Sequence, residues 1–145
     1  MGPHFRRQRP WRLQHHPPGH PRDGGAGLRT SGFLSSVSAE RGGGVFGSVA
    51  YSAAKAAQLG FAKPLAREVG PHGITVDAVA PGLIDTDITG GALEGDTKTQ
   101  LLAGIPVGRN GQVADVADVI TFLCREQTGY ITGATYDING GSHMH

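Results

Sequence analysis

The stretch GITVDAVA at residues 73–80 decides the fold, because it is a short apolar run rich in β-branched residues that ends at Pro81-Gly82. Such a run predicts a buried strand. Before it, an alanine-rich stretch from about Tyr51 to Glu68 ends at Gly70-Pro71 and predicts a helix. Pro64 lies inside that helix and removes one backbone hydrogen bond, so we expect a kink or a local weakness there.

The same order of elements repeats after this strand. Apolar residues recur at helical spacing over residues 113–125, and residues 130–132 suggest a short strand segment. Thr135–Ile138 predict a final strand that Asn139-Gly140-Gly141 ends. Alternating strands and helices predict an α/β fold with a parallel sheet covered by helices.

Length and composition exclude several classes of protein. The chain has 145 residues, 38% of them hydrophobic and 17% charged, which suits one ordinary domain and excludes a wholly disordered chain. No apolar run is long enough to span a membrane, and we expect no membrane partner. The single cysteine, Cys124, excludes an internal disulfide framework and a cysteine-rich zinc site, and it fits the cytoplasmic location that we expect.

Residues 1–33 differ from the remainder of the chain. They hold six arginines and one aspartate, whereas residues 34–145 have a net charge of −4. Proline and histidine are frequent and neither strand nor helix periodicity is present, so we predict an irregular, basic, disordered leader. Nucleic-acid binding is a remote alternative, because no recognisable binding module accompanies the charge. Its four histidines have no acidic partner nearby, and we predict no metal site.

The segment Tyr51-Ser52-Ala53-Ala54-Lys55 carries the clearest chemical signal. The four-residue spacing places the phenol of Tyr51 and the ammonium of Lys55 on one face of the helix, one turn apart. A nearby cation stabilises the phenolate and lowers the pKa of a tyrosine, which is ordinarily about 10. Lys55 could therefore convert Tyr51 into a general acid/base, although most such pairs only form a solvated face.

Two further segments surround this pair in the sequence. Upstream, Leu34-Ser35-Ser36-Val37-Ser38 places hydroxyl groups at a strand end, where one could donate a hydrogen bond to a substrate carbonyl. Downstream, residues 79–86 (VAPGLIDT) place a tight turn and a hydroxyl after the buried strand, where open α/β sheets bind ligands.

Together these segments resemble the short-chain dehydrogenase/reductase family over residues 34–145, in particular its 3-oxoacyl-acyl-carrier-protein reductase-like and sugar-alcohol dehydrogenase-like members. The resemblance implies the C-terminal portion of a doubly wound Rossmann-type parallel sheet. It also implies hydride transfer between NAD or NADP and a small-molecule carbonyl/alcohol substrate, and a homo-oligomer in the intact family.

The resemblance assigns a role to each residue that matches the family's motifs. Tyr51 would be the acid/base, Lys55 would bind the nicotinamide ribose and lower the pKa of Tyr51, and Ser36 would polarise the carbonyl. Ser38 has the family's commonest spacing, but Ser-Ser-Val is its usual local pattern, so we prefer Ser36. The implied cofactor contacts are Tyr51, Lys55, Pro81, Gly82, Ile84 and Thr86.

The resemblance also implies roles outside the site. Residues 87–106 would form a mobile substrate lid, and the helix from Tyr51 to Glu68 would lie in a subunit interface. Asp77 is expected to be a hydrogen-bonding residue of its strand and not a catalytic one.

The glycine-rich turn that binds the cofactor's pyrophosphate in this fold has no counterpart before Ser36. Residues 24–27 (GGAG) have no predicted strand before them. We therefore expect the first nucleotide-binding half to be absent, and hypothesise that residues 1–33 are a frame-shifted reading of a family sequence.

Two functional hypotheses follow. The chain is an NAD(P)-dependent oxidoreductase by descent, or it is a non-catalytic fragment that at most associates through its helix over Tyr51–Glu68. For the isolated chain we favour the fragment, because a missing part of the sheet would leave a strand edge and apolar helix faces uncovered.

Overall fold

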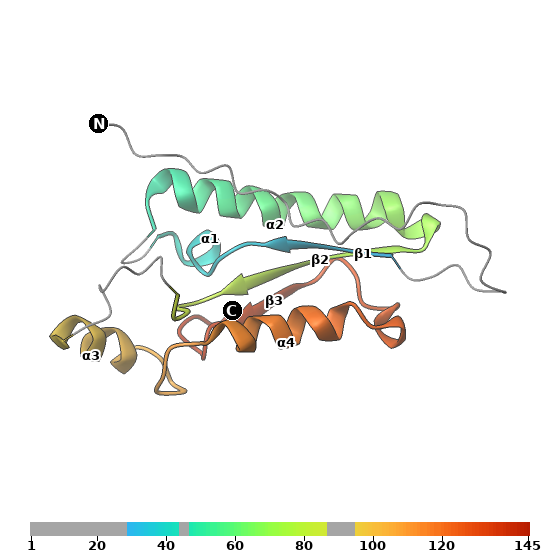
Figure 1. The fold of residues 1–145 in the computed structure, drawn as a ribbon. Coiled ribbons are helices and arrows are strands. Elements are labelled where there is room, and N and C mark those ends of the chain that lie inside the picture. Colours follow the sequence, from blue (N-terminus) through green and yellow to red (C-terminus); the bar gives the residue numbers. More distant parts are fainter. Residues whose placement is uncertain (1–28, 44–46, 87–94) are drawn as a thin grey trace.

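The computed structural model describes residues 29–43, 47–86 and 95–145. Its three strands are β1 (Arg29–Leu34), β2 (Ile74–Pro81) and β3 (Thr135–Ile138), which pair in parallel in the order β1-β2-β3. Helix α2 (Val49–Val69) covers one face of this sheet and α4 (Val113–Leu123) covers the other (Figure 1). The predicted α/β fold, a partial Rossmann-type sheet, is confirmed.

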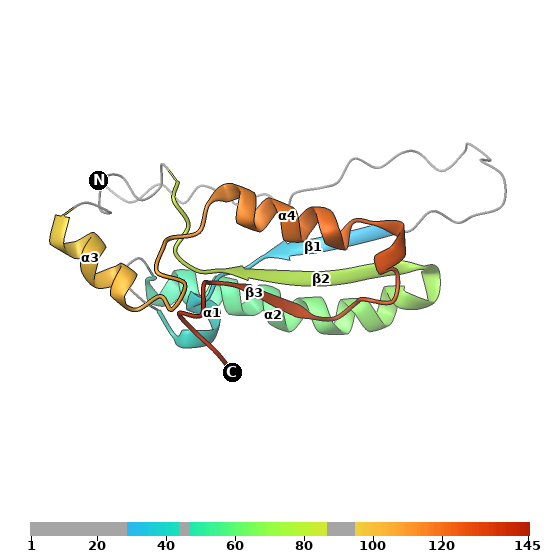
Figure 2. The same cartoon turned by 90° about the horizontal axis from the view of Figure 1, so that it is seen from below.

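The order of elements alternates along the chain. Helix α2 connects β1 to β2, and α4 lies between β2 and β3 in the sequence, beside the sheet in the view of Figure 2. The remaining helices are α1 (Ser38–Arg41), α3 (Gly95–Ala103) and the short 3-10 helices η1 (Gly70–His72) and η3 (Glu126–Thr128). Among the described residues, no helix is both long enough and apolar enough to span a bilayer.

Strand β1 begins at Arg29, five residues before the start that the sequence predicts for the family-like segment at residue 34. Its residues pair with β2 from Arg29 opposite Ile74 to Leu34 opposite Val79. The hydroxyl groups of Thr30 and Thr75 are also hydrogen-bonded across the two strands, 3.0 Å apart. Pairing with β2 makes this segment a strand although its own sequence does not alternate. Residues 1–28, and with them residues 24–27 and the frame-shift hypothesis, lie outside the described residues.

Helix α2 is capped by a serine at its N-terminus and contains a proline in its interior. The hydroxyl oxygen of Ser48 accepts a hydrogen bond from the backbone N–H of Tyr51 at 3.2 Å, which caps the helix. Ala62 and Ala66 are buried against Val76 in the core, whereas Pro64 is exposed. The helix therefore continues over 21 residues despite Pro64, since the packing of its inner face on β2 offsets one lost backbone bond.

Strand β2 is the buried centre of the sheet, as residues 73–80 predict. Every residue from Thr75 to Ala80 is buried. Asp77 is among them, and its carboxylate accepts a hydrogen bond from the backbone N–H of Ala134 at 3.0 Å. Burial raises the pKa of Asp77, and the hydrogen bond from Ala134 opposes that rise. The hydrogen-bonding role predicted for Asp77 is confirmed.

The final strand is confirmed over Thr135–Ile138, whereas the short strand predicted over residues 130–132 is wrong. The backbone N–H of Val76 donates to the hydroxyl of Thr132 at 2.9 Å, so a side chain takes the place of a backbone partner. Gly133 then turns the chain with a φ of +73°. This local geometry prevents residues 130–132 from extending the ladder of β3.

Candidate functional site

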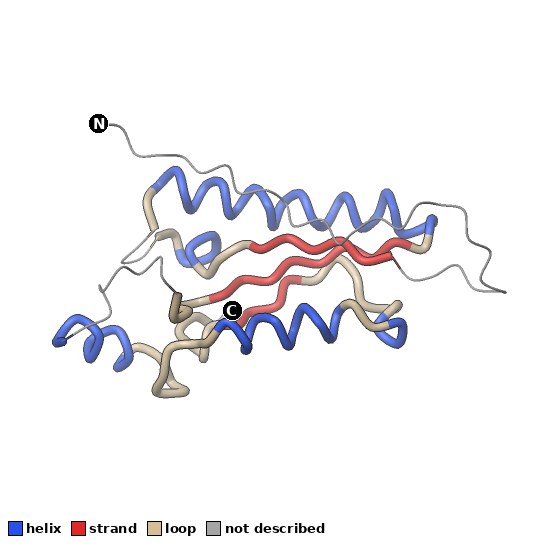
Figure 3. Tube along the Cα trace, in the orientation of Figure 1, coloured by secondary structure: helices blue, strands red, loops and turns tan. Residues whose placement is uncertain are grey.

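The carboxyl ends of the three parallel strands meet at one edge of the sheet, where the loops after β1, β2 and β3 lie together (Figure 3). Backbone hydrogen bonds join these loops. The N–H of Ser35 donates to the carbonyl of Val79 at 2.8 Å, and the N–H of Val37 donates to that of Pro81 at 2.9 Å. The sheet edge thus brings the serine segment next to the turn after β2.

Tyr51 and Lys55 lie on one face in the first turns of α2, as their spacing predicts. The Lys55 Nζ atom lies 5.7 Å from the centroid of the Tyr51 ring. At this distance the ammonium of Lys55 is attracted to the face of the Tyr51 ring.

Lys55 is buried at the end of β1, with only 4% of its surface exposed. Its Nζ donates to the backbone carbonyl of Leu34 at 2.6 Å. In return, the hydroxyl of Ser35 donates to the backbone carbonyl of Lys55 at 2.8 Å. Burial lowers the pKa of Lys55, because removal from water disfavours its charged form. These two reciprocal bonds hold α2 to the strand end.

Both candidate serines are buried just after β1. The hydroxyl oxygen of Ser36 accepts a hydrogen bond from the backbone N–H of Ser38 at 3.2 Å. This bond uses a lone pair of Ser36 and not its O–H donor. Ser38 instead begins α1, and a Cβ added at Gly47 would lie 2.9 Å from its hydroxyl oxygen, so Ser38 packs against Gly47.

The turn after β2 is held by backbone contacts. The N–H of Gly82 donates to the carbonyl of Ile138 at 2.9 Å, and a Cβ at Gly82 would lie 2.8 Å from both Cα and Cβ of Asn139. Only glycine permits this close approach.

The segment from the end of β2 to residue 86 carries the four predicted cofactor contacts Pro81, Gly82, Ile84 and Thr86. Ile84 forms a parallel bridge with Gly111, whose N–H donates to the carbonyl of Leu83 at 2.9 Å. Thr86 is the last residue described before the gap and is half-buried. Of the expected lid over residues 87–106, residues 87–94 lie outside the described part, and most of the remainder forms α3.

Sequence reasoning missed residues that organise the site through their hydrogen bonds. Ser48 could have been found, because a serine three residues before Tyr51 is a typical helix cap. Ser35 and the carbonyl of Leu34 could not, because their partner is Lys55, and only the packing of α2 on β1 brings them together.

The sequence is similar to those of known oxidoreductases. The family model described as enoyl-(acyl carrier protein) reductase matches residues 27–143. The chain is 52% identical over 112 residues to a short-chain type dehydrogenase/reductase of Sinorhizobium fredii, covering 77% of this chain and 44% of that protein. It is 48% identical over 98 residues to the 3-oxoacyl-[acyl-carrier-protein] reductase of Escherichia coli, covering 68% of this chain and 40% of that protein.

Solved structures show the same likeness. A short-chain dehydrogenase/reductase from Brucella melitensis superposes with a TM-score of 0.71 at 32% identity, covering 80% of this chain and 46% of that one. A structure described as a 2-deoxy-d-gluconate 3-dehydrogenase from Agrobacterium tumefaciens with bound NADP has a TM-score of 0.72 at 34% identity, covering 79% and 46%. The chain spans less than half the length of each of these relatives.

Proposed function

The chain belongs to the short-chain dehydrogenase/reductase family, and we propose that it carries the proton-transfer part of an oxidoreductase site acting on a carbonyl/alcohol pair. The observation that carries this proposal is the position of Lys55, whose buried ammonium lies 5.7 Å from the ring centroid of Tyr51 at the carboxyl end of β1. Lys55 is the one lysine or arginine among the residues described as buried.

Tyr51 is the proposed acid/base. In the direction of reduction, its hydroxyl donates a proton to the substrate oxygen as the carbonyl carbon gains a hydride, and in the direction of oxidation the proton returns. The ammonium of Lys55, 5.7 Å from the ring centroid of Tyr51, supplies a positive charge beside the ring that gives up the proton. Because the carbonyl of Leu34 holds Nζ at 2.6 Å, the cation has a defined position relative to the ring.

Ser36 is the proposed residue that orients the substrate carbonyl. It lies buried directly after β1, on the same loop that Ser35 ties to Lys55. Its hydroxyl oxygen already accepts a bond from Ser38, so the O–H can be directed at a substrate oxygen. The packing of Ser38 against Gly47 supports Ser36 over Ser38 for this role.

The donor set at the end of β1 fits the nicotinamide ribose end of NAD or NADP. Lys55 is a buried donor over the ring of Tyr51, and an ammonium and a phenol hydroxyl suit the hydroxyls of a ribose. When bound, the cofactor supplies or accepts the hydride. None of the described turns between a strand and a helix has the glycine pattern that binds a pyrophosphate, so the fit covers only this end.

Titration of the purified chain with NADH and NADPH, followed by turnover of a ketone, tests the proposal. We expect binding of one of the two cofactors and a loss of turnover of at least about a hundredfold in Tyr51→Phe, which removes the acid/base group. Tyr130→Phe is the matched control, since Tyr130 is fully exposed and should leave turnover unchanged. Equal turnover in Tyr51→Phe and the unmodified chain would contradict the role of Tyr51.

A second candidate function is association without catalysis. Among the described residues, β1 pairs only with β2, so its outer edge has no strand beside it. Helix α2 also presents apolar side chains to solvent, with Val49 exposed at 90% and Phe61 at 55%. These surfaces favour self-association or pairing with another chain.

The two candidates differ in measurable ways. If association is the function, light scattering detects an oligomer that Phe61→Glu dissociates, while neither nicotinamide cofactor binds. Ala57→Glu is a control for the added charge, since Ala57 is exposed on the same helix and its substitution removes only a methyl group. A monomer that turns over a ketone would contradict this second candidate.

A further inference from the structure

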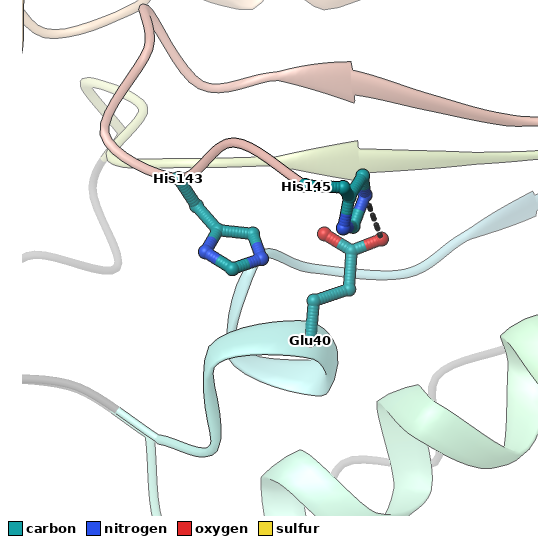
Figure 4. Close-up of side chains that lie close together, drawn as sticks. All are labelled: Glu40, His143 and His145. Atoms are coloured by element: carbon teal, nitrogen blue, oxygen red, sulfur yellow. Dashed lines mark ion pairs between the residues drawn. The ribbon is translucent and has the colours of Figure 1, made fainter.

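A cluster of ionisable side chains that does not include Tyr51 or Lys55 lies where α1 meets the chain that follows β3 (Figure 4). Glu40 comes from α1, while His143 and His145 come from the end of the chain. One ligand-type atom from each of the three residues lies within 4.8 Å of the others. The cluster joins residues that are far apart in the sequence, so no sequence spacing indicates it.

Asp137 of β3 adds a second carboxylate to this cluster. The Nε2 atom of His145 lies 3.0 Å from an oxygen of Asp137 and 3.7 Å from an oxygen of Glu40. The two imidazole rings are packed edge to face, with their centroids 5.2 Å apart. Two imidazoles and two carboxylates are a common set of ligands for zinc and related divalent ions.

Glu40 has a buried carboxylate oxygen without a hydrogen-bond partner in the described part of the chain, which favours a bound cation. Its side chain is only 9% exposed. Its oxygen Oε2 is fully buried and has no hydrogen-bond partner among the described residues. A buried carboxylate oxygen without a partner is costly, and a nearby second carboxylate adds repulsion. Burial and Asp137 raise the pKa of Glu40, whereas His145 lowers it.

The C-terminal segment is held in place by its own hydrogen bonds. The side-chain amide of Asn139 donates to the backbone carbonyl of His143 at 3.0 Å, and its oxygen accepts from the N–H of Gly141 at 2.8 Å. Asn139 is itself buried. The backbone that carries the histidines is therefore positioned before any ligand binds, which reduces the ordering that binding requires.

We propose that Glu40, Asp137, His143 and His145 form a binding site for a divalent transition-metal ion of the zinc class. Tetrahedral zinc with bonds of about 2.0–2.1 Å holds its ligands roughly 3.4 Å apart. The ligand atoms of Glu40, His143 and His145 would therefore close by up to about an ångström or slightly more, while the 3.0 Å contact of His145 with Asp137 would widen slightly. His145 would move from its contact with Asp137 to the ion, and the free oxygen of Glu40 would gain its partner.

The ion would link α1 to the segment after β3. Ser38 begins α1 and donates its backbone N–H to Ser36, so a fixed α1 also fixes the turn that carries Ser36. The site is thus a structural clamp that positions the serine loop, and the ion does not contact the reacting atoms.

Calorimetric titration of the full chain with Zn²⁺ tests the proposal, independently of any turnover. We expect one site whose dissociation constant rises at least about a hundredfold in Glu40→Gln and in His143→Ala, because loss of even an outer-shell partner costs 10- to 100-fold. His145 and His143 lie in an exposed or half-exposed tail, so His143→Ala should leave the fold intact. Co²⁺ should give the visible absorption of a tetrahedral site in the unmodified chain but not in Glu40→Gln or His143→Ala.

His72→Ala is the matched control, because His72 is exposed in η1 and outside the cluster. All variants keep the four histidines of residues 1–33, so zinc held there would survive every substitution. Unchanged affinity in Glu40→Gln and His143→Ala would therefore overturn the proposal. Absence of zinc binding in the unmodified chain would also overturn it. If Glu40→Gln were then more heat-stable, a proton shared between Glu40 and Asp137 would explain how the buried Glu40 carboxylate is stabilised.

Discussion

The loops after β1 and β2 lie side by side at one sheet edge, but they are built in different ways. Side chains secure the loop after β1, where Lys55 and Ser35 exchange hydrogen bonds with the backbone of the facing element. Backbone contacts secure the loop after β2, where Gly82 lies directly against Asn139. The first arrangement uses buried polar side chains, whereas the second uses a close approach of two backbone segments. The proposed chemistry therefore depends on the loop after β1, and the shape of the proposed site depends on the loop after β2.

The largest expected effect comes from adding a Cβ at Gly82, where the backbone lies close to Asn139. A Cβ in Gly82→Ala would lie 2.8 Å from the Cα and Cβ atoms of Asn139, and relief of that overlap requires backbone movement. We expect the free energy of unfolding to fall by about 3 kcal/mol, as measured by urea denaturation. Gly60→Ala is the control, because a Cβ there meets nothing within 4 Å and the exposed helix position should become about 0.5–1 kcal/mol more stable. Equal changes in the free energy of unfolding in the two variants would show that the backbone at Gly82 can move away from Asn139 at little cost.

A smaller effect is expected from removing one side-chain bond after β1. Ser35→Ala deletes the buried hydrogen bond to the carbonyl of Lys55 and should lower the free energy of unfolding by about 1–2 kcal/mol. Ser52→Ala is matched to it, because the Ser52 hydroxyl is buried without a partner among the described residues. That control should be neutral or stabilising by up to about 0.5 kcal/mol. A destabilisation of similar size in both variants would mean that the Ser35 bond contributes nothing.

The smallest net effect near neutral pH is expected at Lys55. Lys55→Met loses the bond to Leu34 but also removes the penalty of burying a charge, so the two changes nearly cancel. The variant should instead alter the pH dependence of stability. Because the folded pKa of Lys55 lies below its ordinary value of 10.5, the unfolded chain binds more protons in that window and stability rises with pH through it.

Denaturation midpoints measured between about pH 7 and pH 10 test this dependence. The rise should be smaller in Lys55→Met than in the unmodified chain. Lys63→Met is the control on the same helix, where an exposed side chain should change stability by less than about 0.5 kcal/mol and leave the rise intact. An unaltered rise in Lys55→Met would show that Lys55 is not desolvated in the folded chain.

The sequence predicts the elements that depend on local pattern. The apolar run of β2, the helical spacing of α4 and the final strand Thr135–Ile138 are found within a few residues of the expected bounds. Residues 130–132 mislead, because a tertiary contact overrides the local signal there. Packing on β2 carries α2 past Pro64, and the Thr132 hydroxyl takes a backbone partner away from the sheet.

The sequence by itself determined the family, the parallel α/β arrangement and the pairing of Tyr51 with Lys55, since each rests on residues close together in the chain. Only the tertiary structure decided that β1 extends back to Arg29, that Lys55 is bonded to Leu34, and that Glu40 meets two histidines. The physical reason is the range of the interactions. Helical spacing and apolar runs are local, whereas a buried hydrogen bond or a cluster of ligands requires segments that packing brings together.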